Sequence, residues 1–164
     1  MLRWNEFEAA APEVAAHVRG LLEQFGFVFA GTIRRDGTPR ISPVEAHLVR
    51  GELMLVLIAG TLKARDLLRD PRIVLNSPVT DPADPGAEFK LRGCVAEVDP
   101  GQRAATAEAI HTASGWRPPA EWHHFAVHVD DVAFLRWQRG ALDMLHWTLR
   151  EGTRRVRRPP PALG

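Results

Sequence analysis

The chain has 164 residues, a formal net charge of +1 and one cysteine, Cys94. This length favours one domain over residues 1–164, and the small charge offers no general attraction to nucleic acid or anionic lipid. A single cysteine excludes an internal disulfide and favours a reducing compartment. We find no signal-peptide core and no apolar run long enough to span a bilayer, so we expect a cytoplasmic protein without a membrane or nucleic-acid partner.

The first predicted element is an amphipathic helix over residues 12–25. Its apolar residues recur at spacings of three and four, which places them on one face: Val14, Val18, Leu21, Leu22 and Phe25. Pro12 suits the first turn of a helix and Gly26 suits its exit. We therefore expect residues 1–25 to form an amino-terminal helical segment.

A three-stranded antiparallel meander is predicted next. Residues 27–33 and 40–49 flank Asp36-Gly37, a strong hairpin signal. Pro43 cannot donate a ladder hydrogen bond, so it marks an edge, a bulge or a point where the ladder opens. The third strand, residues 53–58, is apolar throughout, so both of its faces should be covered. One face would meet a barrel core, and the other would meet a helix or a second subunit.

The rest of the chain continues the β-rich pattern. Helices are predicted over residues 62–69 and 100–113, strands over 72–77, 88–98, 122–129 and 132–138, a loop over 78–86, and a last hairpin over 143–149 and 153–158 before a tail. At least six strands in mostly hairpin order, with two or three helices inserted, favour a mainly β (α+β) fold. We expect a small antiparallel barrel with peripheral helices.

The turn after the third strand is the strongest candidate binding site. The strand ends at Gly60-Thr61, and Lys63 and Arg65 follow at the start of the predicted helix. A helix amino terminus presents free N–H groups and a positive dipole end, which favour an anion and most often a phosphate. The alternative is that Thr61 is an ordinary helix cap with two cations on a solvated face. We favour the anion site.

Other candidate residues carry weaker signals. Ser42 and Val44 share one strand face. One interpretation is an opened strand whose backbone borders a planar ligand, and the alternative is an ordinary edge strand with a bulge at Pro43. His47 has the opposite parity and is predicted to be a surface or interface residue. His124 and His128 share a strand face, but no Cys or Glu spacing accompanies them, so we predict no metal site.

No catalytic machinery of the chain's own is apparent. The sequence has no nucleophile motif, no Walker loop and no dinucleotide-binding glycine pattern. Five arginines between residues 150 and 158 lack interleaved aromatics, which favours an exposed strand and tail over nucleic-acid binding. An anion site without a catalytic triad is the pattern expected when a cofactor carries the reactivity.

Two motifs stand on either side of the apolar strand. They are Thr32-Ile-Arg-Arg-Asp-Gly-Thr-Pro-Arg-Ile-Ser-Pro-Val44 and Thr61-Leu-Lys-Ala-Arg-Asp-Leu-Leu-Arg-Asp-Pro-Arg72. Their order resembles the pyridoxamine 5′-phosphate oxidase-like, FMN-binding split-barrel superfamily. The resemblance is strong from about residue 25 to residue 75 and looser over residues 88–138. It implies a six-stranded antiparallel split β-barrel and a homodimer with FMN in clefts between the subunits.

The resemblance also implies site residues. Lys63 matches the lysine that grips the FMN phosphate, and Thr61 matches the hydroxyl position two residues earlier. Arg65 lies beside that motif as a possible further contact. The remaining matches border the isoalloxazine ring from two facing strands: Val56, Leu57 and Ile58 on one, and Ser42, Pro43 and Val44 on the other. No catalytic residue is implied.

Departures from the family pattern bear on substrate and cofactor. Ser42 stands where the vitamin B6 oxidases have an arginine, and their carboxy-terminal Trp/Arg signature is not found cleanly in residues 141–158. Asp66 stands where an Asn is common, which places a negative charge near the expected phosphate. We expect an FMN-dependent oxidoreductase acting on an unidentified small molecule. The alternatives are a deazaflavin-dependent reductase of the same fold and a non-catalytic dimer that binds haem or another cofactor, or none.

Overall fold

The computed structural model describes residues 1–79, 86–138 and 141–159. Its strands are β1 (Phe27–Ile33), β2 (Pro39–Val49), β3 (Glu52–Leu57), β4 (Arg72–Asn76), β5 (Ala87–Glu97), β6 (His123–Gln138), β7 (Ala141–Thr148) and β8 (Gly152–Arg158). Its helices are α1 (Trp4–Ala10), α2 (Pro12–Phe25), α3 (Leu62–Arg69) and α4 (Pro100–Ser114). The helix and strands predicted over residues 12–77 are confirmed to within two residues at each end.

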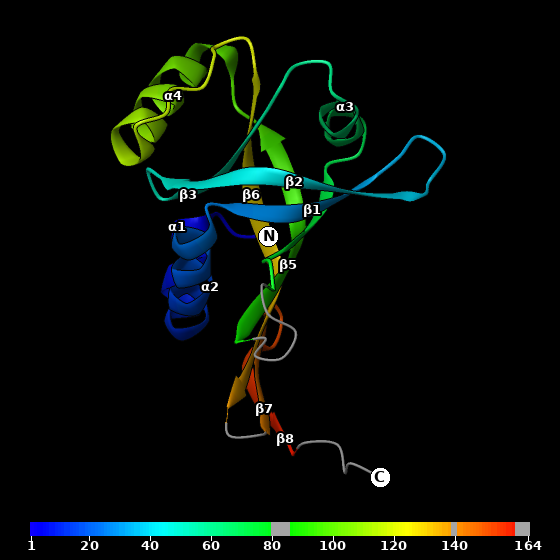
Figure 1. Ribbon diagram of the computed structural model, residues 1–164, viewed down its shortest axis with the longest axis vertical. Helices are drawn as coiled ribbons and strands as arrows, with labels where there is room; N and C mark the ends of the chain where they lie inside the picture. Colours follow the sequence, from blue (N-terminus) through cyan, green and yellow to red (C-terminus); the bar gives the residue numbers. More distant parts are fainter. Residues whose placement is uncertain (80–85, 139–140, 160–164) are drawn as a thin grey trace.

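One antiparallel sheet organises the fold, in the order β3-β2-β1-β4-β5-β6-β7-β8. An additional pairing joins β3 to β6, which closes β1 to β6 into the six-stranded barrel that was predicted. Figure 1 shows α4 and α3 on opposite sides of the upper barrel, with α1 and α2 together on one flank. The barrel core is filled by alternate, fully buried side chains: Leu53, Leu55, Phe89, Leu91, Phe125 and Val127.

The first helix, α1, was not predicted. Trp4 and Phe7 lie one turn apart on it and are 1% and 0% exposed. Their rings meet edge to face, and Phe7 also packs against Trp147 of β7 with ring centroids 4.9 Å apart. A seven-residue helix is too short to show a clear periodic pattern, and it is stabilised by these tertiary contacts.

The predicted strands 122–129 and 132–138 are one continuous strand, β6, so their separation was wrong. The strand continues through Asp130 and Asp131 by forming a β-bulge. Arg92 pairs with Asp131 and Gly93 pairs with Val129, so Asp130 is the extra residue. A Cβ at Gly93 would lie 1.8 Å from the backbone oxygen of His128. Only glycine allows β5 and β6 to approach this closely at the bulge, which keeps the long strand bent around the barrel.

A helix, rather than a second subunit, covers the outer face of β3. Met54 and Val56 point away from the barrel core and are 3% and 6% exposed. They form a separate apolar cluster with Val49 and with Ile110 of α4. The sequence predicted that either a helix or a second subunit would cover this face. Helix α4 covers it, which explains why β3 is apolar throughout.

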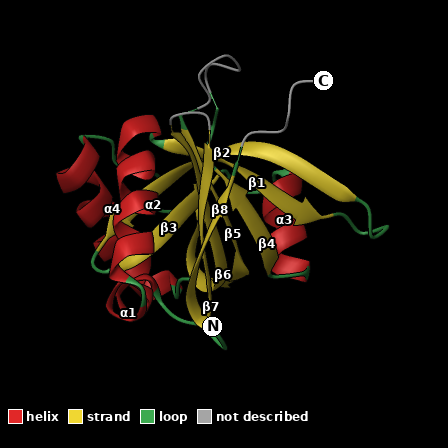
Figure 2. Cartoon of the chain, turned by 90° about the horizontal axis from the view of Figure 1, so that it is seen from below, coloured by secondary structure: helices red, strands yellow, loops and turns green. Residues whose placement is uncertain are grey.

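The final hairpin was predicted and is present as β7 and β8. It extends the sheet beyond the barrel (Figures 1 and 2). The side chains of β8 are largely exposed, and an ion pair between Arg155 and Glu13 ties the strand to α2. Most of the loop predicted at 78–86, and the end of the tail, lie outside the described residues. None of the described helices has the length and apolar character needed to cross a membrane.

Candidate anion and ligand site

The barrel opens along half of β2. From Pro39 to Glu45 this strand pairs with β1, but its ladder with β3 begins only at Ala46. Pro43 therefore lies where one edge of β2 has no strand partner in the described sheet, as its missing N–H predicted. The opening exposes backbone carbonyl groups of β2 to whatever lies beside the strand.

Helix α3 lies beside this opening through its first turn. The ammonium Nζ of Lys63 donates a hydrogen bond of 2.9 Å to the backbone oxygen of Pro43. Thr61 occupies the cap position of α3, but its hydroxyl donates backward to the oxygen of Ile58 at 2.9 Å and makes no capping bond. The first N–H groups of the helix are left without a side-chain cap, next to the half-buried cation of Lys63. That combination suits a bound anion.

The other predicted site residues differ in what they can offer a ligand. Val44, Val56 and Leu57 are 5%, 6% and 2% exposed, so their side chains are part of the packed interior. Ile58 is 51% exposed at the end of β3. Ser42 is half-buried, and Arg65 is exposed with no side-chain hydrogen bond or ion pair within the described part of the chain. Their roles in ligand binding stay predictions.

Asp66 has a set of partners that the sequence did not reveal. It lies on the inner side of α3 and is 4% exposed. Its Oδ2 accepts hydrogen bonds from Arg40 Nε at 2.7 Å and from Thr32 Oγ1 at 3.1 Å. Its Oδ1 accepts one from Arg69 at 3.2 Å. The carboxylate thus joins α3 to β1 and β2, and its charge is balanced by two arginines before any ligand is considered.

The pKa of Asp66 reflects two opposing effects. Burial alone would raise it. Hydrogen bonds to the charged form, of which that from Arg40 is the strongest, outweigh burial and hold the pKa below its ordinary value. Asp66 is therefore ionised at neutral pH and held within its own network.

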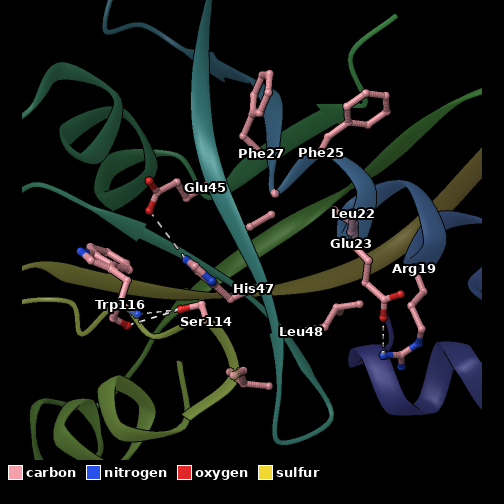
Figure 3. Close-up of a pocket in the computed structure, with 14 residues that line it drawn as sticks. Arg19, Leu22, Glu23, Phe25, Phe27, Glu45, His47, Leu48, Ser114 and Trp116 are labelled. Carbon is pink, nitrogen blue, oxygen red and sulfur yellow. Dashed lines mark hydrogen bonds and ion pairs between the residues drawn. The ribbon is translucent and has the colours of Figure 1, made fainter. Parts of the chain in front are cut away.

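A cleft of about 620 Å³ lies further along β2, between α2 and the end of α4. Figure 3 shows His47 in it, with Trp116 and Ser114 on the α4 side and Arg19 and Glu23 on the α2 side. The rings of His47 and Trp116 stack at an interplanar angle of 20°, with centroids 5.7 Å apart. The cleft combines an apolar wall with a few polar groups, as small-molecule sites do.

His47 lines this cleft, although the sequence analysis did not place it in a candidate site. Its Nε2 atom is buried and makes no hydrogen bond within the described residues. The nearest acceptor, Glu45 Oε2, is 3.9 Å away, too far for such a bond. Burial lowers the pKa of His47, although Glu45 acts in the opposite direction, so the ring is neutral at pH 7. Its parity on β2 was read correctly, but its burial depends on Trp116, which is distant in sequence.

The candidate anion site and the cleft both lie along β2. Pro43, Glu45 and His47 alternate along the outer face of β2, at about 6.6 Å for each two residues. The carbonyl that Lys63 contacts is therefore about 13 Å along the strand from His47.

The histidines of β6 do not join this site. His124 is fully buried, and His128 is half-buried on the same face of β6. Within residues 1–79, 86–138 and 141–159, no group of three or more His, Cys, Asp or Glu side chains is arranged to hold a metal ion.

Comparison with known proteins gives structural matches only. No protein-family model matches the chain, and no curated protein does. A protein related to general stress protein 26, of the pyridoxinephosphate oxidase family from Clostridium acetobutylicum, has a TM-score of 0.58 at 16% identity over 90% of this chain and 97% of its own. An F420 reductase has a TM-score of 0.54 at 24% identity, over 71% of this chain and 94% of its own.

A third match is a heme binding protein from Mycobacterium smegmatis, with a TM-score of 0.59 at 16% identity over 90% of this chain and 88% of its own. These identities are too low to transfer a cofactor or an activity, but the shared architecture is clear. The described barrel, its closing β3–β6 pair and these structural matches together show that the chain has the split-barrel fold of the pyridoxamine 5′-phosphate oxidase-like proteins.

Proposed function

We propose that the protein binds FMN through its phosphate and acts as a flavin-dependent oxidoreductase on a small molecule. The observation that carries this proposal is the position of Lys63, a half-buried cation beside the uncapped amino terminus of α3 and against the opened edge of β2. The Asp66 network supports it, because the acidic residue that sequence placed near the phosphate is already paired with Arg40 and Arg69.

In this proposal each part of the site has a distinct role. Lys63 and the first N–H groups of α3 hold the phosphate by charge-assisted hydrogen bonds. The exposed end of β3 at Ile58 and the backbone around Pro43 orient the ring and exclude water from one side of it. The flavin, when bound, supplies the redox chemistry, and we assign no catalytic residue to the chain.

We also propose a homodimer with the cofactor between its subunits. The outer face of the sheet beside the site carries exposed apolar side chains on three adjacent strands: Phe29 on β1, Ile41 on β2 and Val74 on β4, which are 39%, 75% and 40% exposed. Ile41 and Val74 flank Gly31 in register, so they form a continuous row. A second copy of the chain would cover this row. An Ile41→Arg variant should then shift the mass measured by light scattering from dimer to monomer.

Titration of the purified protein with FMN tests the cofactor proposal. We expect the protein to quench FMN fluorescence on binding. The affinity for FMN should be about tenfold or more weaker in Lys63→Ala, because a charge-assisted hydrogen bond is lost. Lys90→Ala is the matched control, since Lys90 is the only other lysine of the chain and its ion pair is with Glu88 on β5. Equal affinities for FMN in the two variants would contradict the proposal that Lys63 binds the phosphate.

A deazaflavin is the second candidate, because its phosphate would occupy the same clamp and one structural match is an F420 reductase. Titration with F420 separates the two by which cofactor raises the melting temperature. Ligand at 100 times its dissociation constant should add about 2.7 kcal/mol to the free energy of unfolding. A protein that responds to neither, and that shows a haem absorption band on adding haem, would instead be a haem binder.

A further inference from the structure

The cleft around His47 is not accounted for by phosphate binding. It is separated from the Lys63 contact by about 13 Å of β2, and its walls come from α2 and the segment after α4. Its volume of about 620 Å³ is within the range of small-molecule sites. The question is what chemical class of ligand its walls would accept.

The stacked pair of His47 and Trp116 selects for flat rings. The two side chains are nearly parallel, and Trp122 lies beyond Trp116 with ring centroids 5.9 Å apart. Phe25 and Phe27 line the opposite end of the same cleft. Aromatic side chains on both sides favour a planar aromatic ligand, because offset stacking adds to the gain from apolar burial.

The charges on the walls select against anions. Glu45 and Glu23 line the cleft, whereas the only cationic side chain there, Arg19, already contacts Glu8 and lies 3.9 Å from Glu23. The neutral ring of His47 adds no positive charge. A carboxylate or phosphate in the cleft would face two acidic groups with no free cation among the described lining residues.

We propose that the His47 cleft binds a planar heteroaromatic molecule that is uncharged or cationic, held against Trp116 with one polar atom opposite His47 Nε2. The buried and unpaired Nε2 supplies the hydrogen bond that fixes the ring's orientation. That this molecule is the partner of the flavin in electron transfer rests on the function proposed above. Binding of an aromatic molecule in the cleft does not depend on that function, because the residues that line the cleft do not include Lys63.

Three probes with the same bicyclic ring test the proposal: quinoline, N-methylquinolinium and quinoline-3-carboxylate, each titrated into isotope-labelled protein at pH 8. The readout is the indole N–H resonance of Trp116, assigned with a Trp116→Phe variant. We expect saturable shifts with quinoline and with N-methylquinolinium. The cation should bind more weakly than quinoline, because its methylated nitrogen cannot form the hydrogen bond with His47, and the carboxylate should bind at least tenfold more weakly than quinoline. Trp137, which is 43% exposed and outside the cleft, is the internal control and should not shift.

Two variants sharpen the test. Glu45→Gln should reduce the advantage of N-methylquinolinium over quinoline-3-carboxylate several-fold. His47→Gln should weaken quinoline binding with the protein still folded by its melting curve. The proposal is overturned if Trp116 does not respond saturably, if Trp137 shifts equally, or if the carboxylate binds as tightly as the other probes.

The same samples separate this proposal from the cofactor proposal. Lys63→Ala should lose FMN affinity and bind quinoline as the wild type does, whereas His47→Gln should do the reverse. If the wild-type protein binds quinoline but not FMN, only the cofactor proposal is overturned. If the wild-type protein binds FMN but not quinoline, only the cleft proposal is overturned.

Discussion

Helix α3 is tied to the barrel by two polar contacts that differ in almost every respect. Asp66 is buried, accepts hydrogen bonds from three side chains and links the helix to β1 and β2. Lys63 is only half-buried and makes one solvent-accessible hydrogen bond, to a backbone oxygen. The first contact fixes the position of the helix, whereas the second can be given up to a ligand at little cost. Fixing the helix from its buried side leaves its amino terminus free for binding.

The largest effect is expected on removing the buried carboxylate. In Asp66→Ala, Arg40 and Arg69 lose their common acceptor and repel each other, so the free energy of unfolding should fall by about 2–4 kcal/mol. Chemical denaturation measures this. Asp70→Ala removes a half-buried carboxylate at the end of the same helix, whose partner Arg72 is exposed, and should cost much less. Equal losses in the two variants would contradict a special role for Asp66.

A smaller loss is expected on removing one donor to the same carboxylate. Thr32 is 2% exposed, and Thr32→Val keeps its shape while leaving Asp66 one hydrogen bond short. The free energy of unfolding should fall by about 1–2 kcal/mol. The control is Thr153→Val on the exposed strand β8, where a β-branched residue is equally suitable and no buried partner is lost. A larger effect at Thr153 would count against the network.

The pH dependence of stability provides a third comparison. Because the folded-state pKa of Asp66 is lowered, its contribution is present above its unfolded pKa of about 3.9 and is lost as pH falls through the folded value. The difference in unfolding free energy between the wild type and Asp66→Asn should therefore shrink between about pH 5 and the folded pKa. Denaturation curves at a series of pH values measure it, and a constant difference would exclude this linkage.

The smallest effect is expected at the exposed contact. Lys63→Met removes one solvent-accessible hydrogen bond and should change the free energy of unfolding of the ligand-free protein by less than about 0.5 kcal/mol. A thermal melt of the ligand-free variant checks this. A loss comparable to that of Asp66→Ala would mean that Lys63 is a structural anchor, and the contrast between the two contacts would disappear.

Local patterns predicted much of this molecule. Helix α2, the meander β1 to β3 and the opened ladder at Pro43 follow from residue spacing and from the missing N–H of proline. The one-piece strand β6 could not be predicted, because the paired aspartates resemble a turn and only the approach of β5 at Gly93 shows that they form a bulge. The candidate anion site could be predicted because its groups are close in sequence.

The remaining features depend on contacts between distant segments. The partners of Asp66 are supplied by Thr32 and Arg40, on two strands that precede the helix by many residues. The burial of His47 depends on Trp116, which follows a helix inserted between later strands. A single sequence gives no signal for either pairing, since no spacing rule connects these residues.

The closing pair of the barrel also sets the order in which the chain can fold. β3 meets β6 only when Leu53 pairs with Val127, and the segment between them contains two helices and two other strands. Closing so long a loop costs chain entropy before any contact is gained, and topologies dominated by such contacts fold in milliseconds to seconds. During synthesis, β1, β2 and β3 leave the ribosome well before β6, so the apolar edge of β3 stays open meanwhile. Barrel closure is therefore expected to be a late step, and destabilising the β3–β6 pair should favour aggregation during folding.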